Sequence, residues 1–149
     1  MKKAAVLATS LVAASCSSTH PVGPETESLF AAAIPICAVL ANPTPFVDKR
    51  VAVSGLYFVS PKGGVFFDRN CERGELSLDR NEQSADLDDK RAIANLRAAW
   101  RIRGDAPVVI AGVLKDHSPS LSCSNSFCSR YTLEMASIVA ARPTTAQSR

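Results

Sequence analysis

The sequence has few of the residues that enzymes most often use for catalysis. It contains two histidines, two tyrosines and one tryptophan among 149 residues. It has no GxSxG, HExxH, Walker A or dinucleotide-binding motif, patterns that mark many hydrolases, zinc proteases and nucleotide-binding enzymes. Because His20 and His117 both fall in segments expected to be loops, a Ser–His or Cys–His catalytic pair is not expected. The sequence therefore predicts a protein that is not an enzyme and needs no cofactor or metal ion.

A long hydrophobic run and a strong net charge are also missing. The apolar stretch Ala4–Ala14 is much shorter than the roughly 20 residues of a membrane-spanning helix. The formal net charge is +3, but Lys2 and Lys3 account for two of these charges. The remaining chain carries fifteen basic and fourteen acidic side chains, a net charge of +1. Composition thus gives no argument for a basic patch or a nucleic-acid partner.

The first sixteen residues, MKKAAVLATSLVAASC, have the organisation of an export signal. Two lysines precede an apolar segment and a run of small residues, which predicts a signal peptide over residues 1–15. The ending VAASC resembles the lipobox of bacterial lipoproteins, with Ala13 where leucine is usual. The resemblance implies cleavage before Cys16, a diacylglyceryl thioether on its sulfur and a fatty acyl chain such as palmitate on its amine. The alternative is an ordinary secretory signal in which Cys16 has no role.

The resemblance also implies a location in the bacterial cell envelope. In lipoproteins a serine after the modified cysteine, here Ser17, permits sorting to the outer membrane. We therefore expect a lipid-anchored protein at the outer membrane, facing the periplasm or the cell surface. Residues 16–28, polar and interrupted by Pro21, Gly23 and Pro24, are predicted to tether the folded domain to this anchor.

Five segments have the composition of β-strands, and one helix interrupts them. Two apolar runs on either side of Ser60–Gly64 predict an antiparallel hairpin. The segment Asp86–Trp100 predicts an amphipathic helix, with acidic residues in its first turn and Gly104 as its C-cap. A short helix, Pro35–Ala41, is expected before the strands. The expected strands are Arg50–Val59, Gly64–Asp68, Glu75–Leu78, Pro107–Leu114 and Arg130–Ala140.

Three strands, a helix and two further strands follow one another in the order of the OB-fold, a five-stranded Greek-key barrel. We therefore predict a mainly β protein with a small OB-like barrel of βββαββ order, preceded by a short helix. Residues 29–142 would form this domain, and residues 143–149 a disordered tail. The segments ICAVLANP, KRVAVSGLY, DRNC and VVIAGVL also resemble small OB-like domains of bacterial envelope lipoproteins of uncharacterised function. That resemblance covers roughly residues 35–140 and implies no catalytic residues.

Four further cysteines follow the signal peptide, and an even number in an exported protein indicates disulfide bonds. Because only four residues separate Cys123 from Cys128, we expect these two to pair, which leaves Cys37 with Cys71. The alternative is a zinc site that combines Cys123, Cys128 and His117. Its spacing does not match the usual zinc ligand patterns, so disulfides are favoured.

OB barrels commonly bind ligands on the face of their second and third strands, between the loops that join strands 1–2 and strands 4–5. Here those loops are Ser60–Gly64 and Asp116–Ser129. Because Phe66 and Phe67 are consecutive in a strand, they point to opposite faces. One belongs to the core, and the other is either an exposed aromatic platform or covered by the N-terminal helix. The candidate binding residues are Lys62, Phe66, Phe67, Arg69, Phe127 and Arg130.

These observations favour a lipid-anchored envelope protein that binds another envelope protein or a glycan through the barrel face. One alternative is an OB-type oligonucleotide-binding module, which would need Lys62, Arg69, Arg73 and Arg130 to line one groove. Another is an inhibitor that inserts the loop Cys123–Cys128 into an enzyme. Fold alone does not choose among these functions.

Overall fold

The computed structural model describes residues 23–60, 63–71, 74–124 and 127–143. The expected signal peptide, Cys16 and the tail beyond Pro143 lie outside the described residues. Among the residues that are described, no helix is long and apolar enough to cross a membrane.

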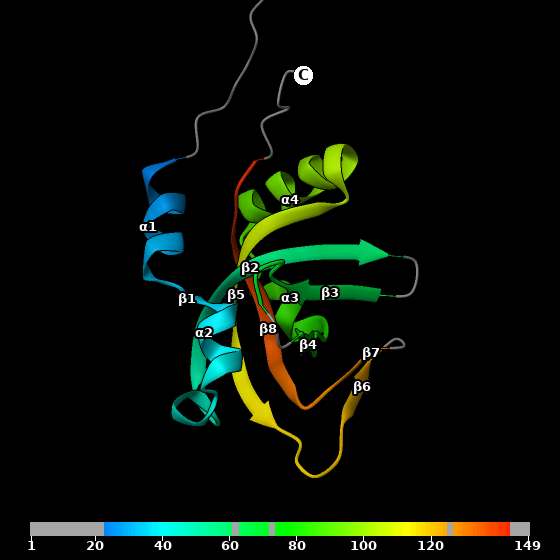
Figure 1. Cartoon of the computed structure of the whole chain (residues 1–149). Helices are drawn as coiled ribbons and strands as arrows, with labels where there is room; N and C mark the ends of the chain where they lie inside the picture. Colours follow the sequence, from blue (N-terminus) through cyan, green and yellow to red (C-terminus); the bar gives the residue numbers. More distant parts are fainter. Residues whose placement is uncertain (1–22, 61–62, 72–73, 125–126, 144–149) are drawn as a thin grey trace, which may run out of the picture.

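The chain alternates short helices with strands before it reaches the long strands of a barrel (Figure 1). The elements in order are α1 (Pro24–Ala32), β1 (Ile34–Pro35), α2 (Ile36–Ala41), a 3-10 turn (Thr44–Phe46), β2 (Arg50–Ser60), β3 (Gly63–Phe67), β4 (Glu75–Leu78), α3 (Glu82–Asp86), α4 (Lys90–Arg103), β5 (Asp105–Asp116), β6 (Ser122–Ser124), β7 (Phe127–Ser129) and β8 (Tyr131–Ala141).

Five strands close into a barrel in the order β2-β3-β4-β8-β5, and pairing of β2 with β5 completes the ring. Strands β4 and β8 run parallel, whereas the other neighbouring strands of the ring are antiparallel. This connectivity, with α3 and α4 inserted between the third and fourth strands of the ring, is that of the OB-fold. Strand β1 lies outside the ring and pairs in parallel with β2. The predicted barrel and its βββαββ order are confirmed.

Two glycines allow the long strands β2 and β5 to curve around this small barrel. A Cβ atom at Gly55 would lie 2.8 Å from Cε2 of Phe66, and one at Gly112 would lie 2.9 Å from the carbonyl oxygen of Glu134. Next to Gly112 the register of β5 against β8 shifts, and Met135 on β8 takes a positive φ of 50°. A side chain at either glycine would therefore push neighbouring strands apart.

Helix α4 packs across one end of the barrel with the apolar stripe that the sequence predicts. Leu96 and Ala99 are fully buried, and Ile93 and Trp100 pack half-buried against the same core. The indole Nε1 of Trp100 donates a hydrogen bond of 3.4 Å to the carbonyl oxygen of Tyr57, and the two rings lie 5.8 Å apart. Trp100 is thus a packing residue at the barrel end.

The start of α4 differs from the prediction, which placed it at Asp86. The helix begins at Lys90, and Asp89 is its N-cap, whose carboxylate accepts a hydrogen bond of 2.7 Å from the Ala92 amide. Residues 82–86 form the separate short helix α3, which begins with a capping box between Asn81 and Ser84. At the other end Gly104 has the left-handed conformation expected of a C-cap, with φ of 79°.

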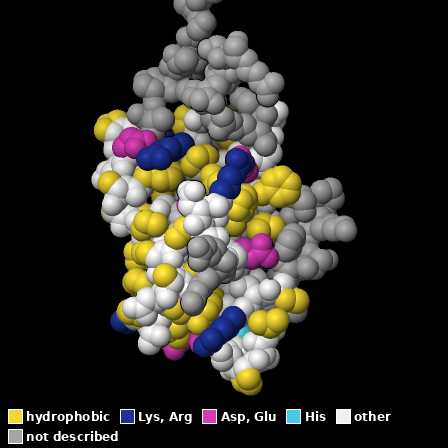
Figure 2. Space-filling view, in the orientation of Figure 1, with side chains coloured by type: hydrophobic (Ala, Val, Ile, Leu, Met, Phe, Trp, Pro, Cys, Tyr) yellow, Lys and Arg dark blue, Asp and Glu magenta, His cyan; other side chains and the backbone are white. Residues whose placement is uncertain are grey.

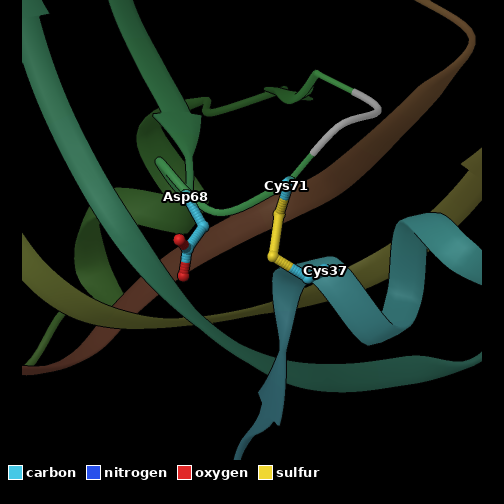
Figure 3. A group of neighbouring side chains, drawn as sticks. All are labelled: Cys37, Asp68 and Cys71. Carbon is cyan, nitrogen blue, oxygen red and sulfur yellow. A yellow bond between two sulfur atoms is a disulfide. The ribbon is translucent and has the colours of Figure 1, made fainter.

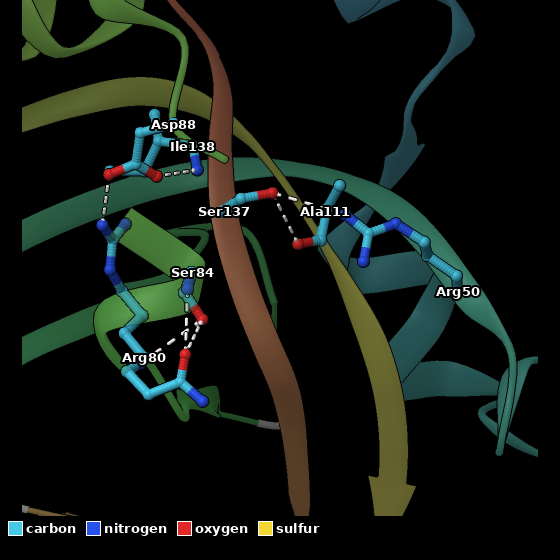
Figure 4. A network of polar contacts seen from close by, with 8 residues as sticks. Arg50, Arg80, Ser84, Asp88, Ala111, Ser137 and Ile138 are labelled. Carbon is cyan, nitrogen blue, oxygen red and sulfur yellow. Dashed lines mark hydrogen bonds and ion pairs between the residues drawn. The ribbon is translucent and has the colours of Figure 1, made fainter. Parts of the chain in front are cut away.

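Asp88 explains why the two helices are separate. Its carboxylate accepts a hydrogen bond of 2.7 Å from the Ile138 amide on β8 and a second from the guanidinium of Arg80 (Figure 4). The Asp88 side chain is only 9% exposed. The residue expected to serve as a first-turn charge therefore fastens the α3–α4 junction to the barrel instead.

The predicted tether is too long at its C-terminal end. Residues 24–28 belong to α1, which packs against β8 and β5. Arg142, after β8, holds this helix: its guanidinium makes two hydrogen bonds to Glu27, of 2.9 and 2.8 Å, and lies 4.1 Å from the centre of the Phe30 ring. The sequence did not indicate this helix because its partner is more than 100 residues away.

Candidate binding groove and cysteine sites

The connection between β5 and β8 is more ordered than the loop that the sequence predicts. It contains the two-stranded hairpin β6–β7, which lies beside β4 (Figure 1). The hydroxyl of Ser129, at the end of this hairpin, donates a hydrogen bond of 3.1 Å to the Glu75 carbonyl oxygen on β4. The hairpin is thereby joined to β4, the third strand of the barrel, which forms part of the face where OB-folds commonly bind ligands.

A groove opens where this hairpin, β4 and the end of α2 meet. Its volume is about 400 Å³. The lining residues mix apolar, polar and charged side chains: Leu40, Pro43, Gly74, Glu75, Cys128, Ser129, Arg130 and Tyr131. A concave surface of this size falls within the range of ligand-binding sites in proteins.

Arg130 is the candidate binding residue that the structure places in this groove. Its guanidinium makes two hydrogen bonds, each of 2.9 Å, to the carboxylate of Asp116, and lies 5.0 Å from the centre of the Tyr131 ring. The hydrogen bond from Arg130 is the main reason why the pKa of Asp116 lies well below its usual range. The Asp116 carboxylate therefore stays ionised at any physiological pH, and Arg130 is held in one orientation at the groove.

The other candidate side chains that the structure describes, those of Phe66, Phe67 and Arg69, do not line the groove with Arg130. Phe66 is fully buried in the barrel core, whereas Phe67 is half-buried on the opposite face of β3. Arg69 forms an ion pair with the largely buried Asp105 at the start of β5. Lys62 and the Phe127 side chain lie outside the described residues. Phe66 is thus a core residue, and Arg69 serves to connect two parts of the barrel.

Sequence reasoning missed the groove residues that come from other elements. Leu40 lies at the end of α2 and Glu75 begins β4, 35 positions apart in the chain. Tyr131 was expected only as a residue of a half-buried strand. It does lie in that strand, and it also lines the groove. Only the aromatic–arginine neighbours Arg130 and Tyr131 could have suggested a binding site from sequence.

Figure 2 shows the charged side chains on one face of the molecule. Lys and Arg side chains form small separate groups there, among hydrophobic and uncharged side chains. No continuous basic groove crosses the described part of this face. An oligonucleotide-binding module would need such a groove.

Cys37 and Cys71 are joined by a disulfide, as predicted, with Cα atoms 5.2 Å apart (Figure 3). The bond connects the first turn of α2 to the segment after β3. Asp68 lies close to the two sulfur atoms, all ligand atoms being within 4.8 Å of one another. Because the sulfurs are bonded to each other, they are not free to act as thiolate ligands for a metal ion.

Cys128 is also disulfide-bonded. In the β6–β7 hairpin its Cα partner is Cys123, directly opposite on the neighbouring strand. The Cys123 side chain lies outside the described part of the structure, so the pairing of these two cysteines stays a prediction.

The barrel, its groove and its disulfides define a small OB-fold protein. Comparison with protein-family models, with curated proteins and with solved structures finds no match. The OB-fold is therefore defined by strand order and register alone.

Proposed function

We propose that this chain is a non-enzymatic binding protein, anchored in the bacterial envelope by lipid on Cys16, whose groove binds a segment of another envelope protein. The observation that carries this proposal is the groove of about 400 Å³ between β4 and the β5–β8 connection. The groove shares the third barrel strand and the connection between the fourth and fifth strands with the usual ligand site of OB barrels, and its other wall is the end of α2.

The lining of the groove favours a peptide segment over a glycan. Leu40 and Pro43 supply an apolar wall, while Glu75 and Arg130 supply charges of both signs. A partner segment with an apolar residue flanked by charged residues would complement both. A glycan remains a second outcome of the test, because Tyr131 also lines the groove and aromatic rings contact sugar rings.

The arrangement of polar groups supports a role without catalysis. His117 is the histidine within the described residues, and its Nε2 atom has no hydrogen-bond partner there. The Ser129 hydroxyl beside the groove donates to a backbone carbonyl, not to a general base. Neither residue has the nucleophile–base geometry that a hydrolase needs.

Photo-crosslinking tests the groove directly. A photoreactive phenylalanine analogue at Tyr131 is expected to give a discrete adduct with one envelope protein in intact cells, identified by mass spectrometry. The same analogue at Leu87, which is 52% exposed at the α3–α4 junction, is the control and should not give this adduct.

The adduct must also depend on the charges of the groove. Combining the Tyr131 probe with Glu75→Lys should abolish the adduct, because the substitution reverses one of the two charges that the partner contacts. An adduct that persists with Glu75→Lys, or that forms equally from Leu87, would contradict binding through the groove. Recovery of polysaccharide fragments in place of a protein would move the proposal to a glycan.

The lipid anchor is tested separately by Cys16→Ser. We expect the parent protein to sediment with membranes and the variant to be lost from the outer-membrane fraction, because each buried acyl methylene contributes about 0.8 kcal/mol to anchoring. Metabolic labelling with a fatty-acid analogue should mark the parent and not the variant. Unchanged outer-membrane retention of an unlabelled protein would contradict lipidation.

A further inference from the structure

The outer face of α4 carries basic side chains that form no ion pair with any residue whose side chain the structure describes. Lys90, Ala94, Arg97 and Arg101 fall within an arc of about 60° when projected at 100° per residue. All four are exposed, on the side of the helix opposite buried Leu96 and Ala99. We call these four residues the basic stripe. No ion pair between described residues involves a member of this stripe.

Helix α4 concentrates basic side chains, which the near-neutral composition of the chain concealed. The segment Lys90–Arg103 contains five basic residues and no acidic residue. The rest of the chain from Cys16 onward has ten basic and fourteen acidic residues, a net charge of −4. The positive charge of this helix is therefore local and does not show in the total.

The basic stripe lies at the end of the barrel where the chain enters from Cys16. Figure 1 shows α1, α4 and the C-terminal end of β8 together at this end. A Cβ atom at Gly23, just before α1, would lie 3.5 Å from Nη1 of Arg91 on α4. Seven residues lead from Cys16 to Gly23, and a chain of this length spans at most about 25 Å. A lipid on Cys16 would thus keep α4 close to the membrane surface.

Arg91 itself is left out of the basic stripe. It lines a hollow of about 160 Å³ between α1, α4 and β8 together with the acidic residues Glu25 and Asp89. Lys90, Arg97 and Arg101 do not line this hollow.

We propose that the basic stripe docks on the anionic phospholipid headgroups of the membrane that holds the protein. The placement of the stripe near the bilayer rests on the proposed lipid anchor, whereas its attraction to anionic lipid does not. The small side chains of Ala94 and Ala98 lie next to the charged ones, so no bulky apolar side chain projects from this face. Such a face can approach a planar surface closely. The exposed positions of this face carry no aromatic residue, although proteins that bind single-stranded nucleic acids use aromatic residues for stacking.

With α4 docked on the membrane, the groove would be directed away from the lipid and open to a protein partner. Strand β8 runs from Tyr131, in the groove, to Ala141, whose carbonyl oxygen accepts a hydrogen bond of 2.9 Å from Asn95 of α4. The strand has eleven residues from Tyr131 to Ala141, a length of about 33 Å along the strand. With α4 on the headgroups, the groove would face away from the membrane.

Vesicle binding of the Cys16→Ser chain tests this surface without the anchor. Binding is measured to vesicles of phosphatidylcholine alone and to vesicles that also contain phosphatidylglycerol. The affinity for phosphatidylcholine, which includes the apolar signal segment, is subtracted from the affinity for the mixed vesicles. Phosphatidylglycerol is expected to increase the affinity of the parent chain for vesicles. In the double variant Arg97→Ala/Arg101→Ala this increase should be about 25-fold smaller, or about fivefold for each basic residue removed. The matched control is Lys49→Ala/Lys115→Ala, which removes the same charge near the other end of β2 and β5 and should lose less than threefold.

The outcomes separate this inference from the proposed function. An equal loss in both double variants, or no loss in either, would overturn docking through the basic stripe, even if Cys16→Ser confirms the anchor. A selective loss for Arg97→Ala/Arg101→Ala supports docking even if the anchor test fails. If only single-stranded DNA binding, and no vesicle binding, depends on these arginines, the surface is a nucleic-acid site and the proposal is wrong.

Discussion

Replacing Asp88 with alanine is expected to lower the free energy of unfolding by about 3 kcal/mol. The carboxylate accepts hydrogen bonds from the Ile138 amide and from Arg80, and it is 9% exposed. Removing it leaves a largely buried amide and a guanidinium without their acceptor. Chemical denaturation at neutral pH measures the change, which should appear as a lower midpoint with an unchanged slope.

The variant Asp88→Asn separates charge from hydrogen bonding. Its amide oxygen can still accept from Ile138, so it should lose only about half as much stability as Asp88→Ala. Asp86→Ala is the matched control, since Asp86 is exposed, and it should change stability by less than about 0.5 kcal/mol. If Asp88→Ala is as mild as this control, the network of Figure 4 does not hold α4 on the barrel.

Removing the Cys37–Cys71 disulfide should have an effect of similar size. The two cysteines are 34 positions apart, and the chain-entropy model gives about 4 kcal/mol for closing a loop of this length. The double variant Cys37→Ala/Cys71→Ala should unfold at a lower denaturant concentration by this amount. Helix α2 and the wall of the groove formed by Leu40 should loosen first, because the disulfide fastens α2 to the barrel.

Hydrogen exchange can locate that loss. Faster exchange of amides in α2 than in the central strand β5 is the expected pattern for the double variant, because α2 would open locally. If the double variant is within 1 kcal/mol of the parent, the disulfide adds little to a fold that is already complete.

The two proposed surfaces place the functions of the protein at opposite ends of one barrel. The basic stripe on α4 lies next to the entry of the chain, and the groove lies where β8 begins at Tyr131. Asp88 contributes to both, since it positions α4 through β8, the strand that joins the two ends. We therefore expect its loss to weaken vesicle binding as well as stability.

The barrel follows from local features of the sequence. Alternating strands such as Arg130–Ala140, the glycines within the strands and the C-cap Gly104 each depend on neighbours only a few residues away. The expected strands agree with those observed to within about two residues, and cysteine spacing was enough to pair Cys37 with Cys71. The Cys123–Cys128 pairing and Cys16 lipidation stay predictions.

Which surfaces those elements share depends on contacts between distant parts of the chain. Arg142 fastens α1 and Asp88 fastens α4 through partners 115 and 50 positions away. Leu40 and Tyr131, also far apart in the sequence, line one groove. The concentration of basic side chains on α4 was hidden because composition adds all side chains together regardless of position. A sequence pattern reports which face of a helix is polar, but what lies beside that face depends on how the whole chain packs.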